Sequence, residues 1–471
     1  MSQTVNTEIE QLEQQFEAMQ ALVKSEGELS PSQRVNLLKQ LKKALLAEQD
    51  SLICALNEDY GKRSEFDSLM ADILPTISHL NYTIKKLPKW IKPQRRSSGL
   101  LMLPSTVRVY PSSLGVVGVM VPWNFPINLT FGPLISAIAA GNRVAIKLSE
   151  FTPATNQVIV KICAVLQDNV FVIQGEQAVS ECFSQLPFDH LFFTGSTSVG
   201  RHVMAAAAKN LTPVTLELGG KSPVVIAPNM SVKHAVERII FGKCLNSGQI
   251  CVAPDYVLLP KDQEMAFITT FQETFLTMYP NGLQDDDYSA VINHAQFERL
   301  SQLLNNAKEQ KANIYPACEP SIDVSERRMV PHLVTQLPAD NDLLINEIFG
   351  PILPIVTYQE LDDAIAYINA RPHPLALYIM SFDTDVQHKV IAQTRSGGVA
   401  INDTVLQVAL EDAPFGGVGA SGMGQYHGYE GFNTFSKSRT VFKSYRFNPR
   451  ATLLIRYRAL LMNVIKRVFI R

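Results

Sequence analysis

Cys251 is the residue whose type and setting most directly suggest chemistry, because it ends the glycine-containing run Asn246-Ser247-Gly248-Gln249-Ile250-Cys251. A thiolate presented on such a loop is a strong nucleophile toward a carbonyl carbon. A lone cysteine is more often an inert core residue, and we interpret the other five cysteines in that way. These five are Cys54, Cys163, Cys182, Cys244 and Cys318.

Glu217 is the candidate general base. It stands in the run Leu216-Glu217-Leu218-Gly219-Gly220-Lys221, at the end of a predicted strand and directly before two glycines. Strand ends face the ligand crevice in α/β folds, and glycines allow the backbone to approach a ligand closely. A carboxylate in this position can take a proton from a reacting group. The alternative is an acidic side chain solvated at the edge of a loop.

Asn124 is the candidate donor to an oxyanion. It lies in the run Pro122-Trp123-Asn124-Phe125-Pro126, directly after a predicted strand over 115–121. The two prolines restrict the loop, and a side-chain amide donates a hydrogen bond without adding charge. The alternative is a rigid turn with a capping asparagine.

Two further strand ends have features of a nucleotide site. The run from Phe193 to Gly200 passes from a predicted strand into a predicted helix, where backbone amides suit a pyrophosphate. Its glycine spacing matches neither the dinucleotide pattern nor a Walker loop. Lys147 and Glu150 follow another predicted strand, where an ammonium group and a carboxylate can hold ribose hydroxyls. For this pair the alternative is a surface ion pair.

These motifs need a scaffold that brings strand ends together. From Val107 onward, short β-rich runs alternate with helical runs, and a second alternating region extends from about Gly219 to Gly424. This alternation predicts the α/β fold class, with two doubly wound domains whose sheets are mostly parallel. Before them, helical periodicity predicts one helix over 8–24 and a second that Ser30 caps.

Composition limits the partners and the cellular setting. The 471 residues suffice for two or three domains, and 46% apolar with 18% charged residues fits a well-buried globular protein. The net charge of −2 gives no global positive excess, so nucleic acid is not expected as a partner. Scattered cysteines and a polar N-terminus without a signal-peptide pattern predict free thiols and a cytoplasmic location.

The segment 448–471 forms a separate case, because it interleaves basic with apolar residues and contains no acidic residue. This pattern predicts a basic amphipathic helix. One interpretation is a tail that faces an oligomer partner or caps a domain. The other is peripheral attachment to a membrane of anionic lipid, since Lys and Arg near such a surface are attracted to it. No apolar run is long enough to predict a spanning helix.

Several segments, in the same order, resemble landmarks of the aldehyde dehydrogenase superfamily. They are Pro122–Pro126, Lys147–Glu150, Phe193–Gly200, Glu217–Lys221, Gly248–Cys251, Glu347–Pro351 and Pro414–Gly417. The run Gly424–Phe432 resembles the class 3 branch, and within it the chain is most similar to bacterial coniferyl aldehyde dehydrogenases.

The resemblance implies oxidation of an aldehyde to a carboxylic acid. Cys251 would attack the aldehyde carbon, Asn124 and the Cys251 N–H would hold the oxyanion, and Glu217 would activate the water that hydrolyses the thioester. The implied substrate is an aromatic aldehyde such as coniferaldehyde, or a medium-chain aliphatic one. The alternatives are a CoA-acylating or phosphorylating dehydrogenase, or a non-catalytic relative. Glu217 favours hydrolysis, because only that route needs a base.

The resemblance also implies a nicotinamide cofactor and no metal. Lys147 and Glu150 would contact the adenosine ribose, Gly195 and Ser196 the pyrophosphate, and Glu347 with Phe349 the nicotinamide ribose and ring. The remaining residues expected at the cofactor are Pro122, Trp123, Gly200 and Leu218. Because Glu150 would repel a 2′-phosphate, NAD is favoured, and NADP stays open.

Domain boundaries follow from the same resemblance. An NAD-binding domain is expected over 1–94 and 112–218, a catalytic domain over 219–424, and an oligomerisation arm over 95–111 and 425–447. The tail 448–471 follows the arm, and we expect a homodimer. Aromatic residues in the 426–435 segment fit either an apolar aldehyde tunnel or a packed core.

Overall fold

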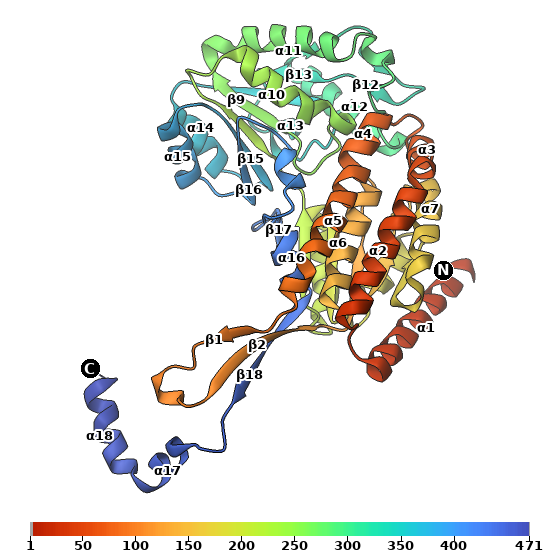
Figure 1. Cartoon of the computed structure of the whole chain (residues 1–471). Coiled ribbons are helices and arrows are strands. Elements are labelled where there is room, and N and C mark those ends of the chain that lie inside the picture. The colour runs from red at the N-terminus through yellow and green to blue at the C-terminus, as the bar shows by residue number, and fades with distance from the viewer. Residues whose placement is uncertain (1–2, 471) are drawn as a thin grey trace.

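The N-terminal quarter of the chain is helical. The computed structural model describes residues 3–470, and Figure 1 shows two α/β bodies from which a thin arm extends. Ser30 caps α2 as predicted: its side chain accepts from the Gln33 N–H, and the Gln33 side chain accepts from the Ser30 N–H. The helices are α1 (Gln3–Glu26), α2 (Pro31–Ala47), α3 (Gln49–Tyr60), α4 (Glu65–Ser68) and α5 (Leu74–Trp90), with a π-helical turn at Leu69–Ile73.

The first body contains a six-stranded sheet in the order β17-β7-β6-β3-β4-β5. All its pairings are parallel except that of β17 with β7, so the α/β prediction is confirmed here. Its strands are β3 (Val116–Met120), β4 (Arg143–Lys147), β5 (Val170–Ile173), β6 (His190–Gly195), β7 (Val214–Leu218) and β17 (Gly422–Met423). The intervening helices are α6 (Pro126–Ala140), α7 (Pro153–Cys163), α8 (Gln177–Gln185) and α9 (Thr197–Ala208).

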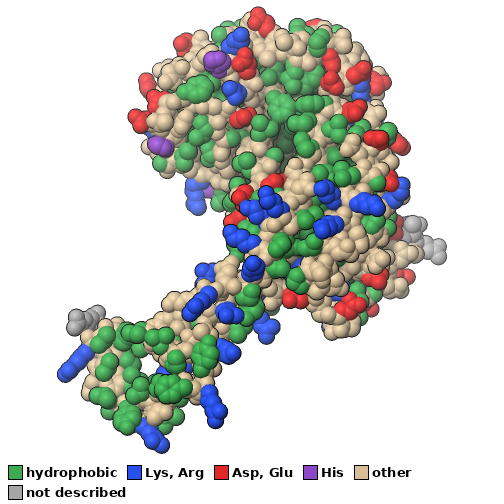
Figure 2. Space-filling model, in the orientation of Figure 1, with side chains coloured by type: hydrophobic (Ala, Val, Ile, Leu, Met, Phe, Trp, Pro, Cys, Tyr) green, Lys and Arg blue, Asp and Glu red, His purple; other side chains and the backbone are tan. Residues whose placement is uncertain are grey.

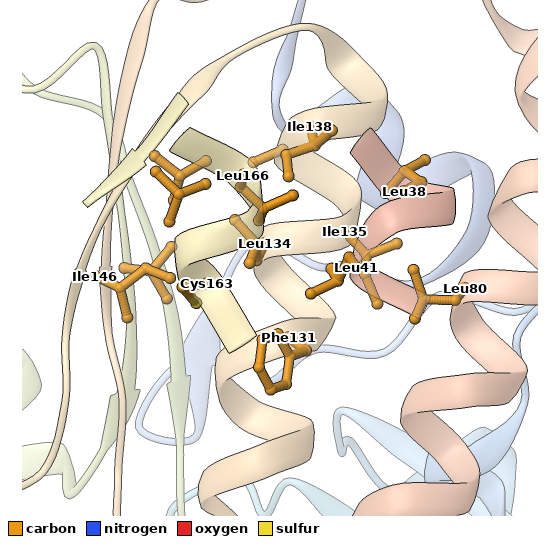
Figure 3. Packing of buried hydrophobic residues seen from close by; sticks show 14 of the residues in the cluster. Leu38, Leu41, Leu80, Phe131, Leu134, Ile135, Ile138, Ile146, Cys163 and Leu166 are labelled. Carbon is orange, nitrogen blue, oxygen red and sulfur yellow. The ribbon is translucent and has the colours of Figure 1, made fainter. Parts of the chain in front are cut away.

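The core of this body joins the helical layer to the sheet. In Figure 3, Leu38 and Leu41 of α2 lie near Leu80 of α5 and Ile135 of α6, and all four side chains are buried. Full burial of one leucine side chain stabilises a fold by about 1.5–3 kcal/mol. The helical layer is therefore a fixed part of the body, and the loops that connect its helices are held against the sheet.

The second body contains a seven-stranded sheet in the order β10-β13-β14-β9-β8-β15-β16. Only the edge strand β10 is antiparallel to its neighbour. Its strands are β8 (Pro223–Ile226), β9 (Tyr256–Pro260), β10 (Asn313–Pro316), β13 (His332–Thr335), β14 (Ile352–Tyr358), β15 (Ala376–Met380) and β16 (Gly398–Ile401). Its helices are α10 (Val232–Cys244), α11 (Glu264–Met278), α12 (His294–Glu309), α13 (Asp342–Ile345), α14 (Leu361–Asn369) and α15 (Thr384–Gln393), and a small hairpin joins β11 (Ile322–Asp323) to β12 (Arg328–Met329).

The arm is a three-stranded antiparallel sheet that projects from the first body (Figure 1). Its strands are β1 (Gln94–Arg96), β2 (Thr106–Ser113) and β18 (Ser436–Lys443). Beyond it the chain ends in two short helices, α17 (Pro449–Arg456) and α18 (Arg458–Val468), so the single amphipathic helix predicted over 448–471 is interrupted at Tyr457. Arg471 lies outside the described residues. None of the helices in the described part of the chain is long and apolar enough to cross a membrane.

The structure departs from the expected domain boundaries at the chain's return from the second body. Strand β17, expected in the catalytic domain, pairs with β7 of the first sheet. Helix α16 (Gly428–Thr434), expected in the arm, packs on α5 and α6. Its Phe432 and the neighbouring Phe435 are buried in the core of the first body, which favours the packed-core alternative for them. Local patterns do not reveal which sheet a returning strand joins, because that choice depends on distant residues. The remaining domain division stays a prediction.

Candidate active site

Cys251 follows a strained loop that begins where α10 ends. Asn246 and Ser247 have positive φ angles of 48° and 51°, and Gly248 has 71°. A side chain at Gly248 would place its Cβ 2.8 Å from the Gly350 carbonyl oxygen. The loop therefore lies directly against the 347–351 segment of the second body, and only glycine allows that approach.

The Cys251 thiol is partly buried between carboxyl groups. Burial is the main cause that raises the pKa of this thiol to about 12, and the carboxyl groups of Glu347 and Glu217 raise it further. The backbone N–H groups of Cys251 and Val252 have the opposite effect on the same pKa. The structure thus brings together the predicted nucleophile, the predicted base and one predicted cofactor ligand, although they are far apart in the sequence.

Glu217 lies on β7, opposite Thr194 of β6 and Gly422 of β17. Its side chain is buried, and neither carboxylate oxygen has a hydrogen-bond partner among the described residues. Burial raises the pKa of Glu217 well above its ordinary value. An unpartnered buried carboxyl group is costly in free energy, and groups with such strongly shifted pKa values are concentrated at functional sites. The alternative of a solvated loop-edge acid is wrong.

The loop that carries Asn124 connects β3 to α6. The Asn124 side-chain nitrogen donates to the Gln249 carbonyl oxygen at 3.1 Å, two residues before Cys251. An amide has two N–H donors, and the second remains for an oxyanion. The capping alternative is not supported, because α6 begins at Pro126 with Phe125 at its N-cap and without a side-chain cap.

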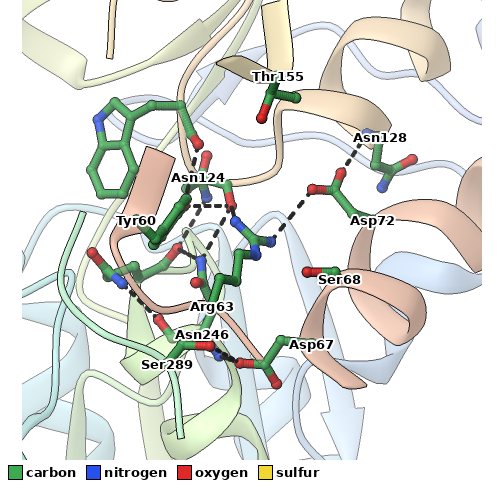
Figure 4. Close-up of polar contacts among 12 residues, drawn as sticks. Tyr60, Arg63, Asp67, Ser68, Asp72, Asn124, Asn128, Thr155, Asn246 and Ser289 are labelled. Carbon is green, nitrogen blue, oxygen red and sulfur yellow. Dashed lines mark hydrogen bonds and ion pairs between the residues drawn. The ribbon is translucent and has the colours of Figure 1, made fainter. Parts of the chain in front are cut away.

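The Asn124 carbonyl oxygen is held from three sides. It accepts hydrogen bonds from the Arg63 guanidinium at 2.9 Å, the Tyr60 hydroxyl at 3.1 Å and the Asn246 side-chain amide at 3.2 Å. Figure 4 shows these donors converging from α3, from the α3–α4 connection and from the cysteine loop. The loops of the predicted nucleophile and of the predicted oxyanion donor are therefore fixed to each other.

Two buried carboxylates anchor this network. Asp72 pairs with Arg63 at 3.4 Å and accepts from the Asn128 N–H at 2.6 Å, and neither side chain of the ion pair is exposed. Asp67 accepts from the N–H of the strained Asn246 at 3.0 Å and from the Ser289 hydroxyl. Burial nevertheless raises the pKa of both aspartates to about 6.

Sequence analysis did not find this network. Its members outside the recognised motifs are Tyr60, Arg63, Asp67, Asp72 and Ser289. Four of them fall in a stretch that shows only helical periodicity. The available signal was a set of three charged residues, Arg63, Asp67 and Asp72, in a region of helical periodicity.

On the cofactor side, Lys147 ends β4 and is buried. Its ammonium group donates to the Leu148 carbonyl oxygen at 2.7 Å and lies 3.8 Å from the Glu150 carboxylate. Burial lowers the pKa of Lys147, and Glu150 partly opposes this effect. Because only Glu150 of the two is exposed, the alternative of an ordinary surface ion pair does not describe Lys147.

Ser196 caps α9 and accepts from the Val199 N–H at 3.4 Å. Gly200 is buried against the adjacent strand, since a Cβ there would lie 2.6 Å from a Leu218 methyl carbon. At Gly195, a Cβ would lie 2.5 Å from the Phe193 ring. In the structure, Gly200 of α9 packs against Leu218 of β7. The cofactor contact expected for these two residues stays a prediction.

The 347–351 segment completes the site from the second body. Burial and Asp255 raise the pKa of Glu347 to about 8, while the Gly220 N–H and nearby cations oppose the shift. The Glu347 carboxylate lies so close to Gly219 that a side chain there would collide with it. Phe349 has a positive φ of 48° and meets the Trp123 ring edge to face at 5.3 Å, beside Pro122.

These residues fit a dinucleotide that extends between the two bodies. Glu217 offers oxygens without a partner among the described residues, and α9 presents the N-terminus of a twelve-residue helix. Among the described residues, no group of three or more His, Cys, Asp or Glu side chains is arranged to hold a metal ion.

The six cysteines are all free, as predicted. Cys163 and Cys244 are buried, which confirms the structural interpretation for both. For Cys54 that interpretation is wrong, because its side chain is exposed on the outer side of α3.

Comparison with known proteins gives consistent results. The model of the aldehyde dehydrogenase family matches residues 2–441. A protein of Pseudomonas aeruginosa named probable coniferyl aldehyde dehydrogenase is 46% identical, over 98% of this chain and 97% of its own. The rat protein named aldehyde dehydrogenase, dimeric NADP-preferring, is 37% identical over 89% of this chain and 91% of its own. The substrate-bound structure of Staphylococcus aureus AldH is 38% identical, with a TM-score of 0.91, and the match covers 96% of this chain and 99% of that one.

Proposed function

The chain belongs to the aldehyde dehydrogenase family, and from this premise we propose which of its residues perform the reaction. The enzyme oxidises an aldehyde to a carboxylic acid with NAD or NADP. The observation that supports the residue roles most strongly is the arrangement at Cys251. Two carboxyl groups influence its thiol, and the loop before it is bonded to Asn124.

In the proposed first half-reaction, the Cys251 thiol gives its proton to water, its sulfur attacks the aldehyde carbon, and the carbonyl π electrons move to the oxygen. The second N–H of the Asn124 side chain and the Cys251 backbone N–H stabilise this oxyanion. A nicotinamide held by Glu347 and Phe349 would supply the acceptor for the hydride. Loss of hydride from the tetrahedral carbon leaves a thioester on Cys251.

In the second half-reaction, Glu217 takes a proton from water as the water oxygen attacks the thioester carbon. The carbon–sulfur bond then breaks. The carboxylic acid leaves the site, and Cys251 remains as the thiolate. The raised pKa of Glu217 suits this step, because a more basic carboxylate is a better proton acceptor near neutral pH. The buried, unpartnered state of Glu217 favours hydrolysis over transfer to CoA or phosphate.

For the cofactor, we assign Lys147 and Glu150 to the adenosine ribose, Gly195 and Ser196 to the pyrophosphate, and Glu347 with Phe349 to the nicotinamide side. Pro122, Trp123, Gly200 and Leu218 would complete the walls of the cleft. Glu150 favours NAD, because its carboxylate would repel a ribose 2′-phosphate.

For the substrate, we propose an aromatic aldehyde such as coniferaldehyde. The similarity to a probable coniferyl aldehyde dehydrogenase, over nearly the full length of both chains, supports this choice. For partners, we propose a homodimer in the cytoplasm that assembles through the arm, and contact of the tail 448–471 with a membrane surface.

The test is NADH formation by the purified enzyme with coniferaldehyde, benzaldehyde and a medium-chain aliphatic aldehyde, each with NAD or NADP and with or without CoA. We expect NAD reduction without CoA, fastest with coniferaldehyde. Cys251→Ala should lower the rate at least about 10⁴-fold, because no other group can form the thioester. Cys54→Ala, which removes an exposed thiol, is the matched control. Activity that appears only when CoA is added would contradict the proposed hydrolysis.

A further inference from the structure

The charges of this chain are divided between two regions. Residues 91–113 and 436–471, which form the arm and the tail, hold 14 of the 42 Lys and Arg residues and none of the 44 Asp and Glu residues. The rest of the chain therefore has 28 basic and 44 acidic residues, a formal charge of −16. A net charge near zero thus conceals a strongly basic projection on an acidic body.

The same projection exposes large apolar side chains. At the tip of the arm these are Leu100, Leu101, Met102 and Leu103. The described tail residues add Leu453, Leu454, Ile455, Leu460, Met462, Val464, Val468, Phe469 and Ile470, and Ile455 is 80% exposed. Figure 2 shows apolar and basic side chains together over this part of the molecule and no acidic ones. Proteins rarely leave so large an apolar surface without a partner.

The tip and the tail form one surface. The Arg450 guanidinium at the start of α17 donates to the Met102 carbonyl oxygen at 2.9 Å and to the Ser444 hydroxyl at 3.2 Å. The arm carries this surface away from both α/β bodies (Figure 1). A partner with a broad surface can therefore contact the arm tip and the tail without contacting the acidic body.

Helix α18 places its apolar residues on one side. Leu460, Val464 and Val468 follow one another at intervals of four, and Leu461 and Ile465 continue the same side. Arg458 and Arg467 lie at the two edges of this side, and Lys466 lies opposite it. Basic residues that flank an apolar face are typical of helices at a lipid interface, whereas the core of a protein interface is depleted of charge.

We propose that the arm tip and the tail dock on the surface of a bilayer that contains anionic lipid. The inference rests on the proposed membrane contact and names the lipid class. The apolar face of α18 enters the interface, the basic residues contact anionic headgroups, and the acidic body is repelled from the same surface.

The test is cosedimentation of the full chain with vesicles of phosphatidylcholine alone or mixed two to one with phosphatidylglycerol. We expect binding to the mixed vesicles that weakens in high salt, because salt screens the attraction. Lys466→Gln with Arg467→Gln should weaken binding about 30-fold, at about fivefold per charge. Lys39→Gln with Lys43→Gln removes the same charge from the exposed side of α2 and should leave binding unchanged.

A second pair tests the apolar face. Leu460→Ser with Val464→Ser should abolish binding to the mixed vesicles, while NADH formation by the same protein stays unchanged. Equal binding to both vesicle types at any salt would overturn the anionic preference and leave the membrane contact standing. No binding to either vesicle type would overturn both the anionic preference and the membrane contact. If deletion of 448–471 also dissociates a dimer, the tail is a contact between copies of the chain. Intact binding of the Leu460→Ser with Val464→Ser variant would overturn the proposed role of the apolar face, whereas the activity of Cys251→Ala tests the proposed catalytic roles separately.

Discussion

The active site and the C-terminal tail use charged side chains in opposite ways. Around Asn124 and Cys251, charged groups are buried and held by partners from other elements, as Arg63 is held by Asp72. In the tail, basic and apolar side chains lie together at the surface. A buried network fixes one geometry, because any other arrangement leaves a charge unpaired in the interior. An exposed surface becomes fixed only when a partner covers it. Preorganised chemistry and partner binding are thus encoded in separate parts of the chain.

Within this comparison, the strongest effect is expected at Glu217, whose buried carboxylate has no partner among the described residues. Glu217→Gln should slow steady turnover about 10²–10⁴-fold, because the thioester loses the base that activates water. The first turnover should survive, so rapid mixing should show a burst of about one NADH per active site, followed by a slow phase. Glu273→Gln, on the exposed side of α11, should change neither phase. A variant that loses the burst as well would place Glu217 in the first half-reaction.

The next effect tests whether the buried network positions the oxyanion donor. Arg63→Met should lower kcat up to about 10²-fold, because the Asn124 loop loses a donor and its position. It should also lower the free energy of unfolding by about 3–5 kcal/mol, since Asp72 is left buried and unpaired. The exposed Arg456→Gln should change that free energy by less than about 0.5 kcal/mol.

The double variant Arg63→Met with Asp72→Asn separates the two roles of Arg63. Asparagine keeps the acceptor for the Asn128 N–H and removes the unpaired charge, so stability should recover in part. The rate should stay low, because no donor replaces the guanidinium at Asn124. Denaturant unfolding and steady-state kinetics on the same samples provide the two readouts. Recovery of rate together with stability would show that Arg63 has only a structural role.

The smallest effect is the dependence of hydrolysis on pH. Burial raises the pKa of Glu217, and only the deprotonated form accepts a proton from water. The rate of the slow step should therefore fall as pH drops through the raised pKa, by about tenfold per unit below it. A rate–pH profile at saturating aldehyde and NAD gives this slope. Glu217→Gln should flatten the profile, and an unchanged slope in that variant would assign the titration to another group.

Features that depend on neighbours along the chain could be predicted from the sequence. The alternation of strands and helices, the cap at Ser30 and the glycine-rich turns are set by local backbone preferences. The basic, apolar character of the tail is also visible in the sequence. The candidate nucleophile, base and oxyanion donor could be named because each stands in a short run of distinctive composition.

Contacts between distant residues became visible in the folded protein. The pairing of β17 with β7, the packing of α16 into the first body and the contact of Gly200 with Leu218 join segments with no local sign of one another. The convergence of Arg63, Tyr60 and Asn246 on one carbonyl oxygen is of the same kind. A buried polar group needs a partner somewhere in the fold, and the sequence around it does not specify where that partner lies.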